Sequence, residues 1–380
     1  MLFLSCENSI AQIVRVATFN AALNREKKGG LLQELLDEAK SEQLANIAEI
    51  IQRVRPDILI LQEFDYDEED RALRLFEEKY LSQSQHGTTP IDYPYFYLPE
   101  TNTGYFSGED LDNDGKLEGP GDAYGFGVFP GQYAFLILSR FPIDLQHVKT
   151  FRKFLWKDMP NANLPFIPET NESYYSEAAL NIFRLSSKNH VDLPVFVGED
   201  TLHLLVAHPT PPVFDGKEDR NGKRNFDEIR LFADYIDSKK GSYLYDDKNK
   251  RGTLSANCYF LIGGDMNADP NDGDSFKGAI NQLLEHPAVN RGVTHGNKIP
   301  HSKGGIENAS NNEQLSNQVG HPKYDTSGWG LRVDYLIPSK NIKIKKSGIF
   351  WPVSNENLSY LTEENASSDH RLVWLDIELK

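Results

Sequence analysis

Short apolar runs rich in β-branched and aromatic residues recur along this chain, and they constrain its fold more than any other feature. Several are nearly continuous in apolar residues, which is typical of strands that are covered on both faces. The pattern predicts two packed sheets, with strands at 14–19, 57–64, 133–141, 202–208, 258–262, 333–337 and 371–379.

Helical patterns lie between these runs. Apolar residues repeat at a spacing of about 3.6 residues in 44–54, 226–236 and 276–284. Pro56 ends the first pattern just before a predicted strand, and Ser275 is suited to cap the third. We therefore expect helices to flank the β core.

Two long stretches rich in Gly and Asn, about 101–131 and 292–330, predict loops rather than linkers between domains. The chain is accordingly predicted to form a single domain over 14–380, with these stretches as loop insertions, preceded by an N-terminal tail at 1–13. Long loops inside a compact domain usually carry function.

The N-terminal tail has two interpretations. Phe3-Leu4-Ser5-Cys6 resembles the end of a bacterial lipoprotein signal, but no basic segment and no full apolar segment precede it. Either the start is truncated or the resemblance is due to chance. A lipid anchor at Cys6 would agree with the location that we expect, which is outside the cytoplasm (secreted, periplasmic or lipid-anchored). No apolar stretch approaches the length of a transmembrane helix.

The formal net charge of −16 repels polyanions unless bound cations or a local basic strip intervene. High-affinity non-specific binding to DNA is therefore disfavoured. Acidic residues interleave with the basic ones within 217–224, so a solvated loop is favoured there over a grip on phosphate; the basic residues are Lys217, Arg220, Lys223 and Arg224. Cys258 lies in an apolar run and is predicted to be a buried, inert thiol.

Polar residues occur repeatedly where the apolar runs end. Asn20 closes the first run, Glu63 nearly closes the second, and His208, Asp265 and Asn267 stand at the ends of later runs. Burying charge is costly unless the charge is paired or bound to a metal, so fold stability does not explain this repetition. The pattern predicts a cation-dependent site at one end of the strands.

Five sequence blocks in a fixed order are more specific than these single residues. They are Arg15–Asn20, Pro56–Glu63, Gly263–Asn267, Arg332–Tyr335 and Ser368–Arg371. This series resembles the endonuclease/exonuclease/phosphatase superfamily, which includes pancreatic-type deoxyribonucleases. The resemblance implies an α/β fold: a four-layer α/β/β/α sandwich of two mostly antiparallel sheets flanked by helices, with the site at one end of the sheets.

The resemblance also implies roles for individual side chains. Glu63 resembles the main metal-ligating carboxylate, with Asn20 and Asp369 nearby as ligands or supporting residues. Hard oxygen ligands of this kind suit Mg²⁺ or Mn²⁺. His370 resembles the general base toward the attacking water, and Asp334 would fix its tautomer.

The remaining residues complete the implied catalytic set. His208 would hold or protonate the phosphate from the other side, while Asp265 and Asn267 would orient the water and the scissile phosphate. Two departures from known branches stand out. Gly131-Gln132-Tyr133 occupies the place where pancreatic-type nucleases carry an acid beside this histidine, and the block around Asp334 lacks the cysteine typical of inositol polyphosphate 5-phosphatases.

An acidic insertion lies within the first long loop. Asp110, Asp112 and Asp114 alternate and are followed by Gly115, which matches the start of an EF-hand loop, but Gly121 stands where the bidentate Glu is expected. The insertion is therefore either a structural Ca²⁺ loop or a solvated acidic turn. We expect it to border the site and to screen it against long polyanions.

Together these features predict an enzyme, a metal-dependent phosphoester hydrolase using in-line water attack on phosphorus. The substrate is expected to be a small phosphoester rather than a nucleic acid, and the protein to be a monomer. A secreted metal-dependent endonuclease is the alternative, because divalent cations can bridge the repulsion. A binding module that has lost catalysis is disfavoured, because the metal ligand and the base are both present.

Overall fold

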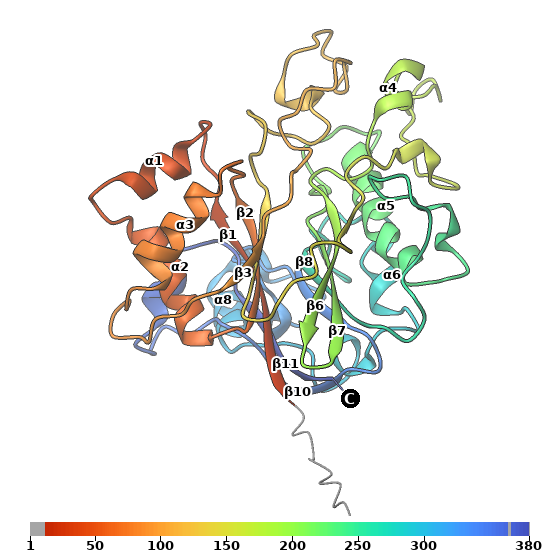
Figure 1. Cartoon of the computed structure of the whole chain (residues 1–380). Coiled ribbons are helices and arrows are strands. Elements are labelled where there is room, and N and C mark those ends of the chain that lie inside the picture. The colour runs from red at the N-terminus through yellow and green to blue at the C-terminus, as the bar shows by residue number, and fades with distance from the viewer. Residues whose placement is uncertain (1–11, 364–365, 380) are drawn as a thin grey trace, which may run out of the picture.

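The computed structural model describes residues 12–363 and 366–379, so Cys6 lies outside the described residues. Figure 1 shows two sheets packed face to face in the middle of the molecule, with helices on both outer sides. The predicted sandwich of two sheets flanked by helices is confirmed. Within the described ranges, no helix is long and apolar enough to cross a membrane.

The first sheet has six strands in the order β10-β11-β1-β2-β4-β3. Strands β1 and β2 are parallel, and the other neighbours are antiparallel. The strands are β1 (Ile13–Leu23), β2 (Ile58–Phe64), β3 (Tyr95–Tyr97), β4 (Phe135–Ser139), β10 (Lys343–Ile349) and β11 (Val373–Glu378).

The second sheet has five strands in the order β5-β6-β7-β8-β9. Here β7 and β8 are parallel and the other neighbours are antiparallel, so the two sheets have the same mixed character. The strands are β5 (Lys149–Thr150), β6 (His190–Val197), β7 (Asp200–Ala207), β8 (Tyr259–Asp265) and β9 (Asp334–Pro338).

The helices divide between the two outer faces (Figure 1). Helices α1 (Gly30–Leu36), α2 (Glu42–Val54) and α3 (Arg71–Phe76) pack on the first sheet, and α5 (Arg220–Tyr235) and α6 (Asn281–Leu284) pack on the second. The shorter elements are α4 (Glu177–Ile182), α7 (Arg291–Thr294), α8 (Gly304–Asn311), a π-helical turn at Glu77–Leu81, and 3₁₀ turns at Pro120–Asp122, Trp156–Asp158, Gly241–Tyr243, Phe276–Gly278, Glu313–Leu315, Pro322–Tyr324 and Ser359–Thr362.

Strand β2 shows how the sequence builds these layers. Ile58 and Ile60 enter the core between the two sheets, whereas Leu59 and Leu61 enter the core under α1 to α3. Successive side chains of a strand point to opposite faces, so a strand covered on both sides needs an apolar residue at every position. The continuous apolar run is therefore explained by burial on both faces.

Two predictions about local structure are wrong. The expected helix over 276–284 is interrupted, because Lys277 and Gly278 have φ values of 48° and 62°, and Ser275 makes no side-chain cap. A right-handed helix cannot include left-handed residues, so only α6 remains helical. The stretch 292–330 is not one long loop either, since it contains α8 and several shorter helical turns.

Candidate active site

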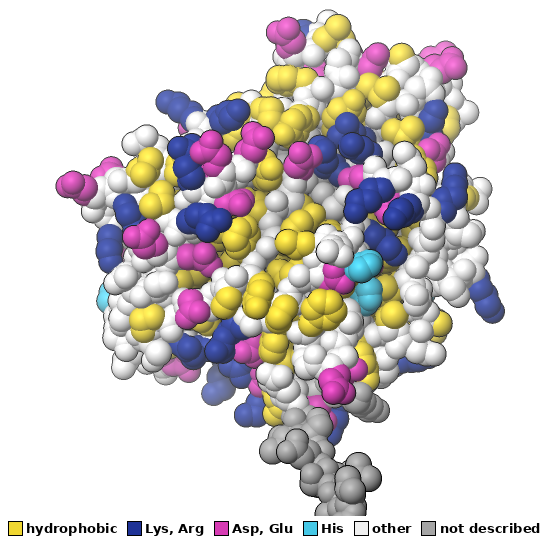
Figure 2. Space-filling view, in the orientation of Figure 1, with side chains coloured by type: hydrophobic (Ala, Val, Ile, Leu, Met, Phe, Trp, Pro, Cys, Tyr) yellow, Lys and Arg dark blue, Asp and Glu magenta, His cyan; other side chains and the backbone are white. Residues whose placement is uncertain are grey.

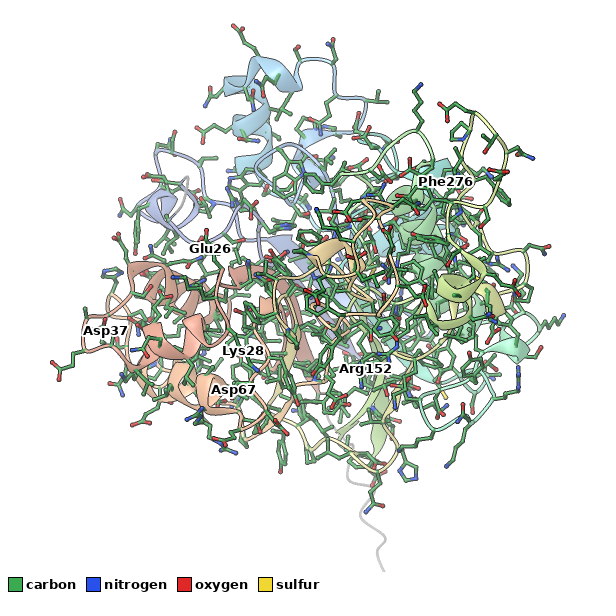
Figure 3. All side chains as sticks on the ribbon, turned by 90° about the horizontal axis from the view of Figure 1, so that it is seen from above. Glu26, Lys28, Asp37, Asp67, Arg152 and Phe276 are labelled. Atoms are coloured by element: carbon green, nitrogen blue, oxygen red, sulfur yellow. The ribbon has the colours of Figure 1, made fainter. Side chains whose placement is uncertain are left out.

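The polar residues singled out in the sequence gather at one end of the sandwich. Strands β1, β2, β7 and β8 all run toward this end, which is the upper end in Figure 1, while β9 and β11 begin there. Figure 3 looks down on it: Glu26, Lys28 and Asp67 mark the half that carries α1 to α3, and Phe276 marks the half that carries α5 and α6. The site therefore combines residues from both sheets.

Asn20 of β1 links the first sheet to the second. Its Nδ2 donates to Glu63 Oε1 and to Asp265 Oδ2, both at 3.1 Å, and lies 3.4 Å from His370 Nε2. Its oxygen accepts from the backbone N–H of Ala22 at 3.2 Å. Asn20 thus presents its amide nitrogen to both carboxylates, and its hydrogen bond orients the side chain of Glu63.

Asp265, the last residue of β8, lies at the centre of the site. Its Oδ2 is 3.5 Å from His208 Nε2 and 3.6 Å from His370 Nε2. Burial raises the pKa of Asp265 to about 7; the charge of Asp334 adds to this rise and that of His370 opposes it. The carboxyl group can therefore exchange a proton near neutral pH.

His370 and Asp334 form a close pair. His370 Nδ1 lies 2.9 Å from Asp334 Oδ2, and its ring makes a T-shaped contact with that of Trp329 at a centroid distance of 5.0 Å. Burial acts to lower the pKa of His370, but the carboxylates of Asp334 and Asp265 outweigh it and raise the pKa to about 10. The two carboxylates therefore favour the imidazolium form of His370.

The backbone that carries these side chains has an unusual conformation. Glu63 and Asn267 have φ values of 60° and 50°, in the left-handed region. Gly264 precedes Asp265 with φ 141°, and a Cβ there would lie 2.0 Å from the carbonyl oxygen of Ala207, so only glycine permits this approach of β8 to β7. Strain of this kind clusters at functional sites.

Asn267 is fixed by its neighbours. Its backbone N–H donates to Asp265 Oδ1 at 2.9 Å, and its Nδ2 donates to the carbonyl oxygen of Pro209 at 3.1 Å. The loop after β8 is thereby joined to the loop that follows His208.

His208 is buried and lacks the acidic partner that pancreatic-type nucleases have. Within the described part of the chain its Nδ1 has no hydrogen-bond partner, and Gln132 binds the backbone of Val128 and Arg25 instead. Burial lowers the pKa of His208 well below its usual value, and the positive charges of Lys188 and His370 lower it further. His208 is therefore neutral.

The residues suited to hold a cation lie beside this centre. Glu63 is partly exposed, and desolvation raises its pKa, with the charge of Asp369 adding to the rise. Asp369 itself is exposed, and the preceding Ser368 anchors the segment by donating to the carbonyl oxygen of Asn20 at 2.7 Å. A cation beside Glu63 would take its remaining ligands from water or substrate, as Mg²⁺ usually does.

A different group at the site has ligand atoms within 4.8 Å of one another, namely Asp265, Asp334 and His370. The predicted ligands Glu63 and Asp369 are not part of such a group among the described residues. Within this group His370 and Asp334 already pair with each other.

Lys188 is a site residue that the sequence did not reveal. It lies in the turn before β6 and is buried. Burial lowers the pKa of its ammonium group, while the charges of Glu228, Glu63 and Asp265 act in the opposite direction. The polar run Ser186-Ser187-Lys188-Asn189 ahead of a strand is the sequence signal that could have indicated it.

The acidic insertion forms a second cluster, in the 101–131 loop that rises above the sheets in Figure 1. Ligand atoms of Asp110, Asp112 and Asp122 lie within 4.8 Å of one another, and Asp110 Oδ1 is buried without a hydrogen-bond partner in the described ranges. Asp114 instead pairs with Lys116 at 3.0 Å. Asp122 thus takes the place that the spacing had given to Asp114.

The predicted solvated basic loop is wrong for three of its four basic residues, because α5 begins at Arg220. Arg220 pairs with Glu218, Lys223 Nζ donates to the carbonyl oxygen of Glu218, and Arg224 is buried. The positive charges of these three residues are therefore paired or buried within the protein. Cys258, predicted to be buried, is partly exposed, and desolvation raises the pKa of its thiol.

Comparisons with known proteins identify a family and similar solved structures. The Endonuclease/Exonuclease/phosphatase family matches residues 17–370. An endonuclease/exonuclease/phosphatase from Beutenbergia cavernae is 14% identical, with a TM-score of 0.52 over 97% of this chain and 72% of that chain. A family protein from Leptotrichia buccalis is 15% identical (TM-score 0.47; 96% and 100% covered), and the human Nocturnin catalytic domain with bound sulfate is 13% identical (TM-score 0.46; 97% and 95% covered).

A comparison with curated protein sequences gave no match. The family match covers nearly the whole chain and includes every residue proposed for the site, from Asn20 to His370. The chain therefore belongs to the endonuclease/exonuclease/phosphatase family, whose members hydrolyse phosphoester bonds.

Proposed function

We propose that this enzyme uses a divalent cation and in-line attack of water on phosphorus to hydrolyse phosphomonoesters or phosphodiesters of modest size. The observation that carries the proposal is the position of Asp265, which accepts a hydrogen bond from Asn20 and lies within 3.6 Å of both His208 and His370. A carboxylate with a pKa of about 7 between two imidazoles is suited to move a proton.

Glu63 and Asp369 would hold the cation, with Asn20 orienting Glu63. The fit rests on the oxygen chemistry of these donors and on the raised pKa of Glu63, which a neighbouring cation would relieve. When bound, Mg²⁺ or Mn²⁺ would polarise a phosphate oxygen and offset the charge on the leaving group.

The chain's own residues would divide the proton chemistry. The family resemblance implies that His370 is the general base, but a histidine whose pKa is raised to about 10 is better suited to donate a hydrogen bond to the phosphate. Asp265 would accept the proton of the attacking water, with Asn267 holding that water in place. Lys188 would contribute a positive charge opposite the phosphate oxygens.

The charge of the protein favours a small substrate over a long polyanion. The net charge of −16 repels a long polyanion. Figure 2, which views the molecule from the side, shows both basic and acidic side chains on that face. A secreted endonuclease is the alternative, in which divalent cations bridge the repulsion. A binding module without catalysis fits less well, because the whole set from Glu63 to His370 is present.

A panel of phosphoesters with Mg²⁺, Mn²⁺ or Ca²⁺ tests the proposal. We expect turnover of p-nitrophenyl phosphate or bis-p-nitrophenyl phosphate that Mg²⁺ or Mn²⁺ stimulates and that His370→Ala removes. Efficient nicking of supercoiled plasmid with negligible turnover of either ester would favour the nuclease instead. No hydrolysis of any of these compounds would contradict the assignment.

We also propose that Asp110, Asp112 and Asp122 bind a structural Ca²⁺. Burial raises the pKa of Asp122, and the charges of Asp112 and Asp110 add to the rise, while the nearby Lys116 forms its ion pair with Asp114. Adding Ca²⁺ to chelator-treated protein should raise the unfolding temperature, and binding at about 100-fold above the Kd would add about 2.7 kcal/mol.

The matched variants separate this cluster from the active site. Asp112→Asn should remove the stabilisation by Ca²⁺, whereas Glu63→Gln should keep it. Equal stabilisation of wild type and Asp112→Asn in thermal unfolding would show that the cluster is only a solvated acidic turn.

A further inference from the structure

Three buried polar residues within little more than one turn join α5 to the loops of the site. Arg224, Asn225 and Glu228 are buried polar residues on this helix, and each binds backbone groups of the loops at the strand ends. Asn225 Nδ2 donates to the carbonyl oxygens of Thr210 and Met266 at 2.8 and 2.9 Å. The helix therefore holds loops that carry site residues, although the sequence gives it only an amphipathic pattern.

Glu228 makes the most consequential of these contacts. One carboxylate oxygen accepts from the backbone N–H and the hydroxyl of Ser187 at 2.6 and 2.9 Å. The other oxygen accepts from the backbone N–H of Thr210 at 2.6 Å. Ser187 directly precedes Lys188, and Thr210 lies two residues after His208. A single side chain thus joins the turn that carries Lys188 to the loop that carries His208.

The charge of Glu228 suits this position. The side chain is fully buried, and its negative charge interacts favourably with the positive charges of Lys188 and Arg224. A buried carboxylate is tolerated when it is hydrogen-bonded and near positive charge, and bonds to charged acceptors are stronger than bonds to neutral ones. A carboxylate can accept from both loops, whereas an amide must turn its NH₂ toward one of two N–H donors.

We propose that Glu228 is a positioning residue that fixes the His208 loop and the Lys188 turn relative to each other, so that both side chains face the phosphate. Its side chain binds Ser187 and Thr210 rather than the proposed metal ligands, and it acts through these two backbone segments. This inference rests on the proposed function.

The test compares two buried carboxylates that are neighbours on α5. Glu228→Gln keeps size and leaves one buried N–H without an acceptor. Asp227→Asn is the control: Asp227 is equally buried but binds Trp156 Nε1 at 2.7 Å and Asn163, away from the strand-end loops. Both variants should lose some thermal stability.

We expect Glu228→Gln to lower kcat for bis-p-nitrophenyl phosphate by about 10- to 100-fold with a smaller change in KM, because misplacement by about 1 Å can cost this much. Glu228→Asp keeps the charge on a shorter side chain, so its kcat should lie between those of the wild type and Glu228→Gln. Asp227→Asn should stay within about threefold of wild type.

Amide hydrogen exchange gives a readout that does not need turnover. Exchange at Ser187 and Thr210 should become faster in Glu228→Gln and remain unchanged in Asp227→Asn. Equal kcat in the two variants, or unchanged exchange in either loop of Glu228→Gln, would overturn the positioning role. A wild-type protein that hydrolyses no phosphoester would instead overturn the proposed function, and the exchange result would still decide whether Glu228 holds the loops.

Discussion

Replacing Glu63 by glutamine is expected to lower Mg²⁺-stimulated hydrolysis by at least about 10²- to 10³-fold while the fold is retained. Glutamine keeps the size of the side chain and an oxygen that can accept from Asn20 Nδ2, a bond of 3.1 Å in the native protein. It loses the negative charge that a divalent cation requires at this position. The loss should therefore appear in metal binding as well as in turnover.

The measurement is kcat/KM as a function of Mg²⁺ concentration, together with the Mg²⁺ affinity from calorimetry. Glu68→Gln is the matched control, because Glu68 lies five residues further along the chain and is exposed. Glu63→Gln should bind Mg²⁺ weakly, and Glu68→Gln should resemble wild type. Wild-type activity and Mg²⁺ affinity in Glu63→Gln would exclude Glu63 as the main ligand.

The strands that sequence patterns predict best are those buried on both faces. Strand β2 is apolar at nearly every position because both of its faces are covered, so it stands out in the sequence as a short continuous apolar run. Strand β6 was missed because Asp192 and Pro194 interrupt it. The structure accommodates both: Asp192 accepts from the hydroxyl of Tyr235 at 2.6 Å, and the carbonyl oxygen of Pro194 accepts from the backbone N–H of Asp144. These partners are distant in sequence.

The same distinction holds for the site. Glu63, Asp265 and His370 could be predicted because each lies in a short ordered block next to a strand. Glu228 could not, because a glutamate in isolation is far more often solvated and only the fold shows that this one is buried. For Lys188 the sequence offers only the polar run ahead of β6, which does not show that the lysine is buried. Site residues that lie in short sequence blocks beside a strand can be predicted from the sequence. Residues that join loops distant in sequence can be identified only from the three-dimensional structure.

The pair formed by His370 and Asp334 is expected to act as one unit. Asp334→Asn preserves the shape of the side chain but removes the charge, and its amide can present N–H to the Nδ1 that Asp334 Oδ2 now contacts at 2.9 Å. The imidazole would then lose its orientation and its preferred protonation state. We expect kcat to fall by about 10²- to 10⁴-fold.

A double-mutant cycle tests this coupling. Because the two groups act together, the double variant Asp334→Asn/His370→Ala should be no less active than His370→Ala alone. Asp376→Asn is the control: Asp376 lies on β11 in an ion pair with Arg15 at 2.6 Å and makes no contact with the site. Losses that add in the double variant would show that the two residues act independently.

The protonation of His370 gives a second measure of the same pair. The carboxylates of Asp334 and Asp265 hold the pKa of His370 at about 10 against the opposing effect of burial, so an NMR titration of the Asp334→Asn variant should show a lower pKa. A raised folded-state pKa contributes stability that is full below the unfolded value of about 6.5 and is lost as the pH rises through about 10. Asp334→Asn should therefore destabilise the protein more at pH 6 than at pH 10, because only at the lower pH does the wild-type protein gain from holding the imidazolium.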